Sequence, residues 1–169
     1  MSIAKRIILI TAIAACCVGC DQTTKSLAQA MLSETEAWSF LGDTFRLQLA
    51  YNRGAFLSLG ASLPAGWREG LFSVGVSGVL LILLAIALFS RSATRTDITA
   101  LALLFAGGVG NLIDRVYAGY VVDFMNIGIG ALRTGIFNVA DIAVTAGVLL
   151  LASDMLYPKK LNHSEDEIN

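Results

Sequence analysis

Aspartates beside apolar segments are the residues of this chain best suited to acid–base chemistry. The only histidine, His163, lies in the polar C-terminal tail, so the sequence does not predict a Ser-His-Asp triad, a Cys-His pair or a histidine-based zinc site. Asp123 and Asp141 can meet, because Asp141 lies about 5 residues, or roughly 8 Å, into the last apolar stretch and a glycine-containing loop joins it to Asp123. Two neighbouring carboxylates cannot both ionise readily, so one keeps a proton while the other stays charged. Such a pair can hydrolyse an amide without a metal ion, a cofactor or a covalent nucleophile.

Four apolar stretches have to position these carboxylates. Hydrophobic residues make up 56% of the 169-residue chain and charged residues 15%, against roughly 25% charged in an average soluble domain. The stretches approach the roughly 20 residues that a membrane-spanning helix needs, and they carry no polar stripe of helical period. They form one domain, residues 1–158, followed by a disordered tail, residues 159–169. We therefore predict an all-α membrane protein with four transmembrane helices, at about residues 4–22, 70–90, 97–115 and 136–156.

The lysines and arginines at the ends of these stretches set the expected orientation. They lie before the first stretch, between the second and third, and after the fourth, and the positive-inside rule makes those positions cytoplasmic. The other two connections then face outward. Apolar and polar residues alternate from residue 45 to residue 51, so we expect a small β element at about residues 38–60 on the outer surface. With a net charge of −1 the chain offers no basic face for nucleic acid.

Further polar residues lie at the outer ends of the predicted helices, where charge is costly and therefore indicates function. Asp21 and Lys25 are spaced i, i+4 and can pair on one helix face, either as a simple helix-end ion pair or as part of a site. The third and fourth stretches contribute Asn111, Asp114, Arg115 and Asn138.

Small residues in the apolar stretches are interpreted as packing residues. Close helix contact is expected at four glycines: Gly75, Gly78, Gly107 and Gly110. The three cysteines lie in the first stretch without a histidine partner, so we interpret them as small apolar filler and predict no metal site: Cys16, Cys17 and Cys20.

Two other interpretations remain open at this point. The same acids could serve a small polytopic transport or proton-relay protein, although a relay would need polar groups that continue to the inner side. The N-terminus also imitates a lipoprotein export signal, in which Cys20 would be lipidated and would begin the mature chain. Cys17 stands where that signal usually carries leucine.

Five blocks, in order and spacing, resemble the lipoprotein signal peptidase family, the type II signal peptidases of bacterial inner membranes. The blocks are Asp21-Gln22-Thr23-Thr24-Lys25, Asn52-Arg53-Gly54-Ala55-Phe56, Gly107-Gly108-Val109-Gly110-Asn111-Leu112-Ile113-Asp114-Arg115, Val122-Asp123-Phe124 and Phe137-Asn138-Val139-Ala140-Asp141. Together they extend over nearly the whole chain. The family often has two alanines after the glycine of the second block, whereas here a single alanine precedes Phe56.

The resemblance implies an aspartic endopeptidase whose catalytic pair is Asp123 and Asp141. Its substrate would be a diacylglyceryl-modified prolipoprotein, cut just before the lipidated cysteine at the periplasmic face of the bacterial inner membrane. The enzyme would be a monomer in contact with membrane lipid, with both termini cytoplasmic and no cofactor. The residues implied to orient the pair or bind substrate are Asn52, Gly54, Asn111, Arg115 and Asn138, and the supporting residues are Asp21, Lys25 and Asp114. Arg115 could pair with Asp114 or with Asp123, and the first helix would be braced against the outer segment by its ion pair.

Overall fold

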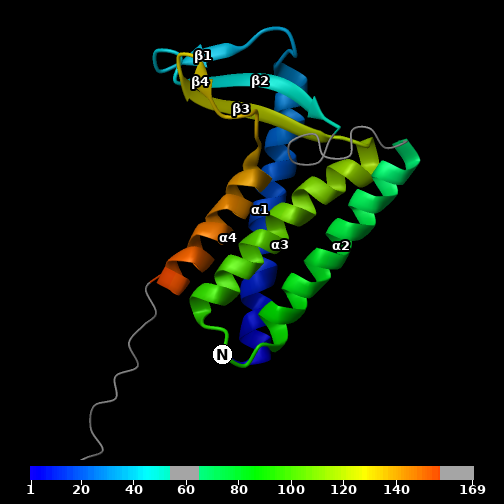
Figure 1. The fold of residues 1–169 in the computed structure, drawn as a ribbon, viewed down its shortest axis with the longest axis vertical. Helices are drawn as coiled ribbons and strands as arrows, with labels where there is room; N and C mark the ends of the chain where they lie inside the picture. The colour runs from blue at the N-terminus through cyan, green and yellow to red at the C-terminus, as the bar shows by residue number, and fades with distance from the viewer. Residues whose placement is uncertain (54–64, 157–169) are drawn as a thin grey trace, which may run out of the picture.

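Four helices stand side by side in the structure, with a sheet across one end of the bundle (Figure 1). The structure is a computed structural model that describes residues 1–53 and 65–156, so Gly54, the rest of the predicted β element and the tail lie outside the described residues. The helices are α1 (Ile3–Met31), α2 (Ala65–Phe89), α3 (Arg95–Ala118) and α4 (Val139–Leu156). The strands are β1 (Trp38–Phe40), β2 (Phe45–Asn52), β3 (Val121–Ile129) and β4 (Leu132–Arg133). We call the end that carries the strands the sheet end, and the end with the N-terminus and residues 90–94 the loop end.

Two of the four helices have the length and hydropathy of membrane helices, and all four expose apolar side chains. Helices α1 and α3 are each long and apolar enough to cross a membrane, with mean hydropathies of 2.0 and 1.5 over their most apolar windows, and α2 contributes the shorter apolar helix Val74–Phe89. Large apolar side chains are exposed on every helix, among them Ile8, Leu81, Val116 and Leu149. Exposed apolar surface of this extent marks contact with lipid or with a partner.

Two helix boundaries differ from the sequence prediction in ways that affect the site. Helix α1 continues without a break to Met31, well beyond the predicted end at residue 22, because residues 23–31 contain neither glycine nor proline. Its last two turns therefore extend alongside the sheet, where Ala28 packs against Leu49 and Val122. Helix α4 begins at Val139, so Asp141 lies in its first turn rather than about five residues inside it.

The β structure is more extensive than the sequence predicted. The strand expected around residues 45–51 is present as β2, but the segment after Asp123, which we expected to be a glycine-containing loop, continues β3 to Ile129 and forms β4. The four strands are antiparallel in the order β1-β2-β3-β4. Strand β3 pairs with β2 so that Ala50 lies opposite Asp123, with a register shift between Leu47 and Ala50. The sheet therefore holds Asp123 and the residues after it on a paired strand, where the sequence predicted a flexible loop after Asp123.

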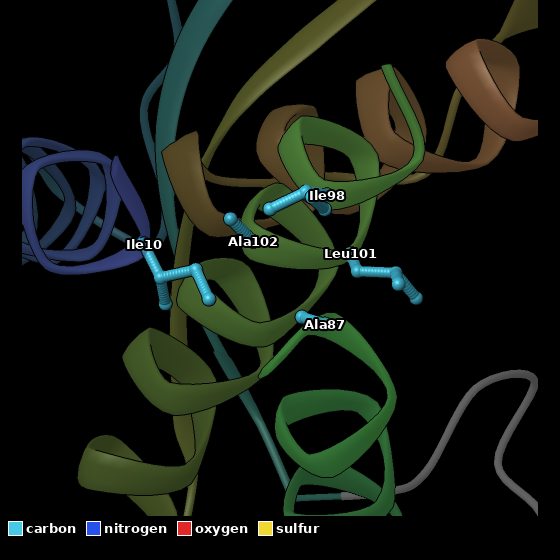
Figure 2. Close-up of a cluster of buried hydrophobic side chains, with 5 residues drawn as sticks. All are labelled: Ile10, Ala87, Ile98, Leu101 and Ala102. Atoms are coloured by element: carbon cyan, nitrogen blue, oxygen red, sulfur yellow. The ribbon is translucent and has the colours of Figure 1, made fainter. Parts of the chain in front are cut away.

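The loop end of the bundle is closed by apolar packing. A buried cluster joins α1, α2 and α3 through Ile10, Ala87, Ile98, Leu101 and Ala102 (Figure 2). Next to it the buried guanidinium of Arg6 donates to the Ala87 carbonyl at 3.0 Å and to the Leu88 carbonyl at 3.3 Å. Arg6 thus satisfies backbone oxygens in the last turn of α2, which have no partner within the helix.

Two of the four predicted packing glycines are in close helix contact and two are not. A Cβ atom on Gly107 would lie 2.4 Å from the Ala140 carbonyl oxygen, and one on Gly110 would lie 2.8 Å from Asp21 Oδ2. The prediction is confirmed there, because only glycine lets α3 approach α4 and α1 so closely. It is wrong for Gly75 and Gly78, since no described atom would come within 4 Å of a Cβ at either position. Helix α2 contacts α3 through larger side chains, such as Leu80 against Gly108.

Candidate active site

The two aspartates predicted to form a pair come from different elements and meet at the sheet end. Asp123 lies on β3 and is 3% exposed, while Asp141 lies in the first turn of α4. Asn138 joins them, because its side-chain nitrogen Nδ2 donates to Asp123 Oδ1 at 2.7 Å and its backbone N–H donates to Asp141 Oδ2 at 3.2 Å. Both carboxylates are therefore hydrogen-bonded to the same fully buried asparagine.

The local sequence explains why Asp141 takes this position. Asn138 immediately precedes α4, and its Oδ1 accepts the backbone N–H of Asp141 at 2.9 Å. Together with the return bond from the Asn138 N–H, this is a reciprocal capping box, in which the third helical residue reaches back to the cap. Asn and Asp are favoured at these positions because they satisfy N–H groups that have no partner in the first turn.

Two further asparagines complete the hydrogen bonds of the pair. Asn52, at the end of β2, donates from Nδ2 to Asp123 Oδ2 at 3.2 Å. Asn111, on α3, donates from Nδ2 to Asp141 Oδ1 at 2.8 Å. Each of the four carboxylate oxygens therefore accepts one N–H donor, and donors come from β2, α3 and the start of α4. The sequence analysis named all three asparagines, and the fold brings them together.

The electrostatic surroundings distinguish the two acids. The pKa of the Asp123 carboxyl is raised from its ordinary 3.8 to about 6. Burial is the largest cause, because it disfavours the charged form, and the negative charge of Asp141 is the second. The hydrogen bonds from Asn52 and Asn138 act in the opposite direction without cancelling these effects. Asp123 is thus suited to be the protonated member of the pair.

A buried ion network lies beside the pair. Lys25 Nζ lies 2.7 Å from Asp21 Oδ2, which confirms the predicted i, i+4 pair, and 2.9 Å from Asp114 Oδ2. The expected contact of this pair with the outer segment is replaced by contacts with α3 and α4, since Asp21 Oδ1 accepts the Ala140 N–H at 2.8 Å. The physical reason is that α1 runs on past the sheet, so this turn faces its neighbouring helices.

Gln22 belongs to the same network, and the sequence analysis did not select it. Its Nε2 donates to Asp114 Oδ1 at 2.9 Å and to the Gly110 carbonyl at 3.2 Å. Gln22 is neutral, so it does not stand out as a charged residue at a helix end. The signal in the sequence that could have indicated it is its place in the first block of the resemblance.

Arg115 takes neither of the two partners that remained open. Within the described part of the chain its guanidinium forms no ion pair, and it donates to the Asn111 carbonyl at a long 3.5 Å. Asp114 is instead paired with Lys25.

Apolar, lipid-type helices that carry two hydrogen-bonded carboxylates at one end define a class: the membrane-embedded aspartic peptidases. The comparisons with known proteins agree with this class. The sequence model of the family described as Signal peptidase (SPase) II matches residues 13–157 of this chain. The chain therefore belongs to the signal peptidase II family of aspartic peptidases.

Curated relatives and solved structures extend the similarity over most of the molecule. The chain is 33% identical over 144 residues to the lipoprotein signal peptidase of Francisella tularensis subsp. mediasiatica, covering 85% of this chain and 88% of that protein. It is 41% identical over 138 residues to the corresponding protein of Sphingopyxis alaskensis, covering 80% and 78%. A bacterial membrane enzyme solved by the in meso method at 2.3 Å resolution superposes with a TM-score of 0.78 at 28% identity, covering 95% and 94%. A second such structure, at 1.9 Å resolution, gives 0.76 at 26% identity, covering 92% and 94%.

Proposed function

We propose that Asp123 and Asp141 are the catalytic carboxylates with which this signal peptidase removes signal peptides from prolipoproteins. The substrate is a diacylglyceryl-modified prolipoprotein, and the scissile bond is the one just before the lipidated cysteine. A site at the end of a bundle of apolar helices suits such a substrate, because the acyl chains stay in the lipid while the peptide bond reaches the carboxylates.

The observation that carries this proposal is the shared asparagine. Asn138 donates to Asp123 at 2.7 Å and to Asp141 at 3.2 Å, so the two acids are held on either side of one rigid group. Among the residues that the structure describes, the other hydrogen bonds of the pair come from the neutral amides of Asn52 and Asn111, which neither accept nor release a proton at ordinary pH. These amides leave proton exchange to the two carboxyl groups, water and substrate.

The raised pKa of Asp123 assigns the two roles. Asp141, ionised and supported by two N–H donors, takes a proton from the attacking water. Asp123, protonated, donates to the scissile carbonyl oxygen as the water oxygen bonds to the carbonyl carbon. In the second half of the reaction Asp141 returns its proton to the leaving nitrogen and Asp123 regains one from the tetrahedral intermediate. The carbon–nitrogen bond breaks and the pair is restored.

The same proposal includes the orientation of the enzyme in the bacterial inner membrane. All four helices cross the bilayer, the loop end is cytoplasmic with both termini, and the sheet lies on the periplasmic surface. Arg91 and Arg95 at the loop end support this orientation through the positive-inside rule. We expect the enzyme to act as a monomer and without nucleic acid or a cofactor.

The two faces of the sheet support its position on the membrane surface. Register places Trp38 opposite Leu47 and Leu47 opposite Met125, so these side chains share a face, and alternation along β3 adds Asp123 and Ile127 to that face. Because Asp123 contacts the start of α4, this apolar face is turned toward the bundle and, beyond it, toward lipid.

The opposite face of the sheet is apolar at Val122 and Phe124, which pack with Ala28 of α1, and polar farther along the strands. Arg46 lies opposite both Ser39 and Asn126 and forms an ion pair with Asp43, and Asn126 accepts from Arg133. Charged groups that are paired with each other in this way are suited to face water.

Replacing each acid separately tests the catalytic proposal. Asp123→Asn and Asp141→Asn should each abolish cleavage of a diacylglyceryl-modified preprotein in membranes, because an amide can be neither general acid nor general base. Asp97→Asn is the matched control, since Asp97 occupies the same capping position at the start of α3 and lies far from the pair. Substantial cleavage by either of the first two variants would remove that aspartate from the mechanism and favour a proton-relay role for the acids.

Tryptophan fluorescence tests the position of the sheet. The chain has two tryptophans, so Trp67→Phe leaves Trp38 on the apolar face as a single reporter. In vesicles with brominated acyl chains, Trp38 emission should be quenched most by bromines within about 5–10 Å of the headgroup boundary. The matched control moves the reporter by one residue, with Trp38→Phe and Ser39→Trp in the same background, and its emission should be quenched by aqueous acrylamide instead. Equal acrylamide quenching of both reporters would show that the sheet stands clear of the membrane.

A further inference from the structure

The ion triad of Asp21, Lys25 and Asp114 is buried, and the reaction described above does not use it. The exposed fractions are 0% for Asp21, 2% for Lys25 and 7% for Asp114. The ammonium group of Lys25 has three N–H donors and three acceptors around it: Asp21 Oδ2 at 2.7 Å, Asp114 Oδ2 at 2.9 Å and Asn111 Oδ1 at 3.0 Å. The triad is thus fully bonded and links α1 to α3.

The two carboxylates of the triad hold the backbone beside each member of the catalytic pair. Asp21 Oδ1 accepts the N–H of Ala140 at 2.8 Å, and Ala140 is the residue before Asp141. Asp114 Oδ2 accepts the N–H of Val122 at 3.0 Å, and Val122 is the residue before Asp123. Lys25 therefore links two elements of the site. Asp114 connects it to the strand that carries Asp123, and Asp21 connects it to the helix that carries Asp141.

The third bond of Lys25 fixes the side chain of Asn111. An ammonium group can only donate, so the carboxamide oxygen of Asn111 faces Lys25 and its nitrogen faces Asp141 at 2.8 Å. The same oxygen accepts from Asn138 Nδ2 at 3.0 Å. Lys25 therefore acts together with Asp141 and Asn138 to select this orientation of the Asn111 amide over its flipped form.

We propose that Asp21, Lys25 and Asp114 are positioning residues that set the separation of the two catalytic aspartates and the donor that faces Asp141. This inference rests on the catalytic pair proposed above and assigns the triad a role in the rate of the reaction besides its role in folding. The energetics of buried charge support it. Apolar side chains of similar volume often stabilise a protein as well as a buried ion triad or better, so stability alone does not account for the three charges.

The packing of α3 leaves room for the carboxylate of Asp21. Gly110 faces Asp21 Oδ2, and a Cβ atom at that position would approach it to 2.8 Å. The absence of a side chain on α3 therefore leaves the space in which Asp21 reaches across to α4.

Two single substitutions that remove the same charge separate positioning from stability. In Asp21 the two oxygens serve different partners, Ala140 on one side and Lys25 on the other, so Asp21→Asn must present an NH₂ group to one of these donors. In Asp114 a single oxygen serves both Val122 and Lys25, so Asp114→Asn can keep both of these bonds. Its NH₂ group then faces the donor Nε2 of Gln22, so the Gln22 side chain has to rotate, and the conflict falls on Gln22 and not on the backbone beside a catalytic aspartate. Each variant leaves the triad with one carboxylate fewer.

The experiment compares kcat per folded molecule for the full-length enzyme in lipid, with a lipid-modified preprotein as substrate. Asp21→Asn should lower kcat roughly tenfold to a hundredfold with little change in KM, because small displacements of catalytic groups cost this much. Asp114→Asn should lower it far less. Arg6→Lys is the matched control, since Arg6 is also a buried cation of α1 but contacts only backbone carbonyls at the loop end, and it should change Tm without changing kcat.

Equal losses in Asp21→Asn and Asp114→Asn, or a fall in Tm with unchanged kcat per folded molecule in both, would overturn the positioning role. If Asp21→Asn does not accumulate as folded protein, Lys25→Arg provides the second test. Its planar guanidinium keeps the charge but cannot direct three bonds at the same oxygens, so kcat should fall while the protein still folds; an unchanged kcat would refute the proposal. These results are independent of the catalytic proposal, which fails only if Asp123→Asn or Asp141→Asn remains active.

Discussion

The starts of α3 and α4 carry the same local motif and differ in what surrounds it. At α3, Thr94 Oγ1 accepts the Asp97 N–H at 3.1 Å and Asp97 Oδ2 accepts the Thr94 N–H at 2.8 Å. At α4, Asn138 Oδ1 accepts the Asp141 N–H at 2.9 Å and Asp141 Oδ2 accepts the Asn138 N–H at 3.2 Å. Both are capping boxes with an aspartate as the third helical residue.

What separates the two motifs is the set of additional bonds. The bonds of the Thr94 cap are exposed, and within residues 1–53 and 65–156 its further side-chain hydrogen bond is a long 3.5 Å bond to Asp154. Asn138 is fully buried and uses its Nδ2 group, which threonine lacks, to reach Asp123. A standard helix start thus becomes a catalytic centre when a second aspartate and its donors pack against it. Tertiary contacts, not the cap itself, make the site.

The largest expected effect comes from a substitution at Asn138 that keeps the helix cap and removes the hydrogen bond to Asp123. Asn138→Ser keeps a side-chain oxygen for the cap but removes the Nδ2 donor to Asp123, so kcat should fall by roughly a hundredfold or more. Tm should also fall, because Asn111 and the Val122 carbonyl lose the same buried donor, but it should fall less than in a variant without the cap. Asn138→Ala removes both functions and should lower kcat and Tm together. The measurements are kcat on a lipid-modified preprotein and Tm by differential scanning fluorimetry. A serine variant with parental kcat would show that the shared asparagine does not matter for the reaction.

A second prediction compares the effect of replacing glycine with alanine at two positions. Gly110→Ala would place a Cβ atom 2.8 Å from Asp21 Oδ2, and overpacking of this kind costs about 1–3 kcal/mol. Gly78→Ala meets no described atom within 4 Å and should raise stability by up to about 1 kcal/mol, because alanine has the higher helix propensity. Chemical denaturation in detergent micelles measures both. Equal effects of the two substitutions would mean that α3 does not approach α1 as closely as described.

The pH dependence of the pair gives a third prediction. The folded-state pKa of Asp123 is raised to about 6, so the free enzyme loses its protonated acid as the pH rises through that value, and kcat/KM should fall about tenfold per pH unit above it. Folding shows the same sign: the stabilisation from protonated Asp123 is complete below the ordinary pKa of 3.8 and is lost as the pH rises through about 6. Asp123→Asn should lack this loss in a denaturation series from pH 4 to pH 8. A parent enzyme whose stability and kcat/KM rise through pH 6 would contradict the assignment of the proton to Asp123.

Local patterns in the sequence were sufficient for part of this architecture. The four helices follow from apolar runs, and the Asp21–Lys25 pair follows from i, i+4 spacing, which depends only on helix geometry. The candidate aspartates and asparagines could be named because polar residues at the ends of apolar helices are unusual. The resemblance of five sequence blocks to one family supported the prediction that these residues form a single site.

The remaining features depend on contacts between distant segments, which no local pattern encodes. The segment after Asp123 was expected to be a loop because Gly128, Gly130 and Gly135 are locally typical of turns. The pairing of β3 with β2 instead joins residues about 70 positions apart, as in Ala50 opposite Asp123. The contact of Asp21 with the backbone before Asp141 joins residues 119 positions apart in the same way. Gly75 and Gly78 illustrate the converse, since small residues permit close contact without requiring it.

The smallest expected effect is at the cap of α3. Thr94→Ala removes the acceptor for the Asp97 N–H and should lower the free energy of unfolding by about 1 kcal/mol, the usual cost of losing an N-cap. Thr94→Ser keeps the hydroxyl and should remain within a few tenths of a kcal/mol of the parent. Because this cap has no bond to the catalytic pair, kcat per folded molecule should be the same in both variants, in contrast to Asn138→Ser. If Thr94→Ala lowered kcat while its fold remained intact, the loop end would be coupled to the reaction. Both capping boxes would then affect the rate, and only the size of the effect would differ between them.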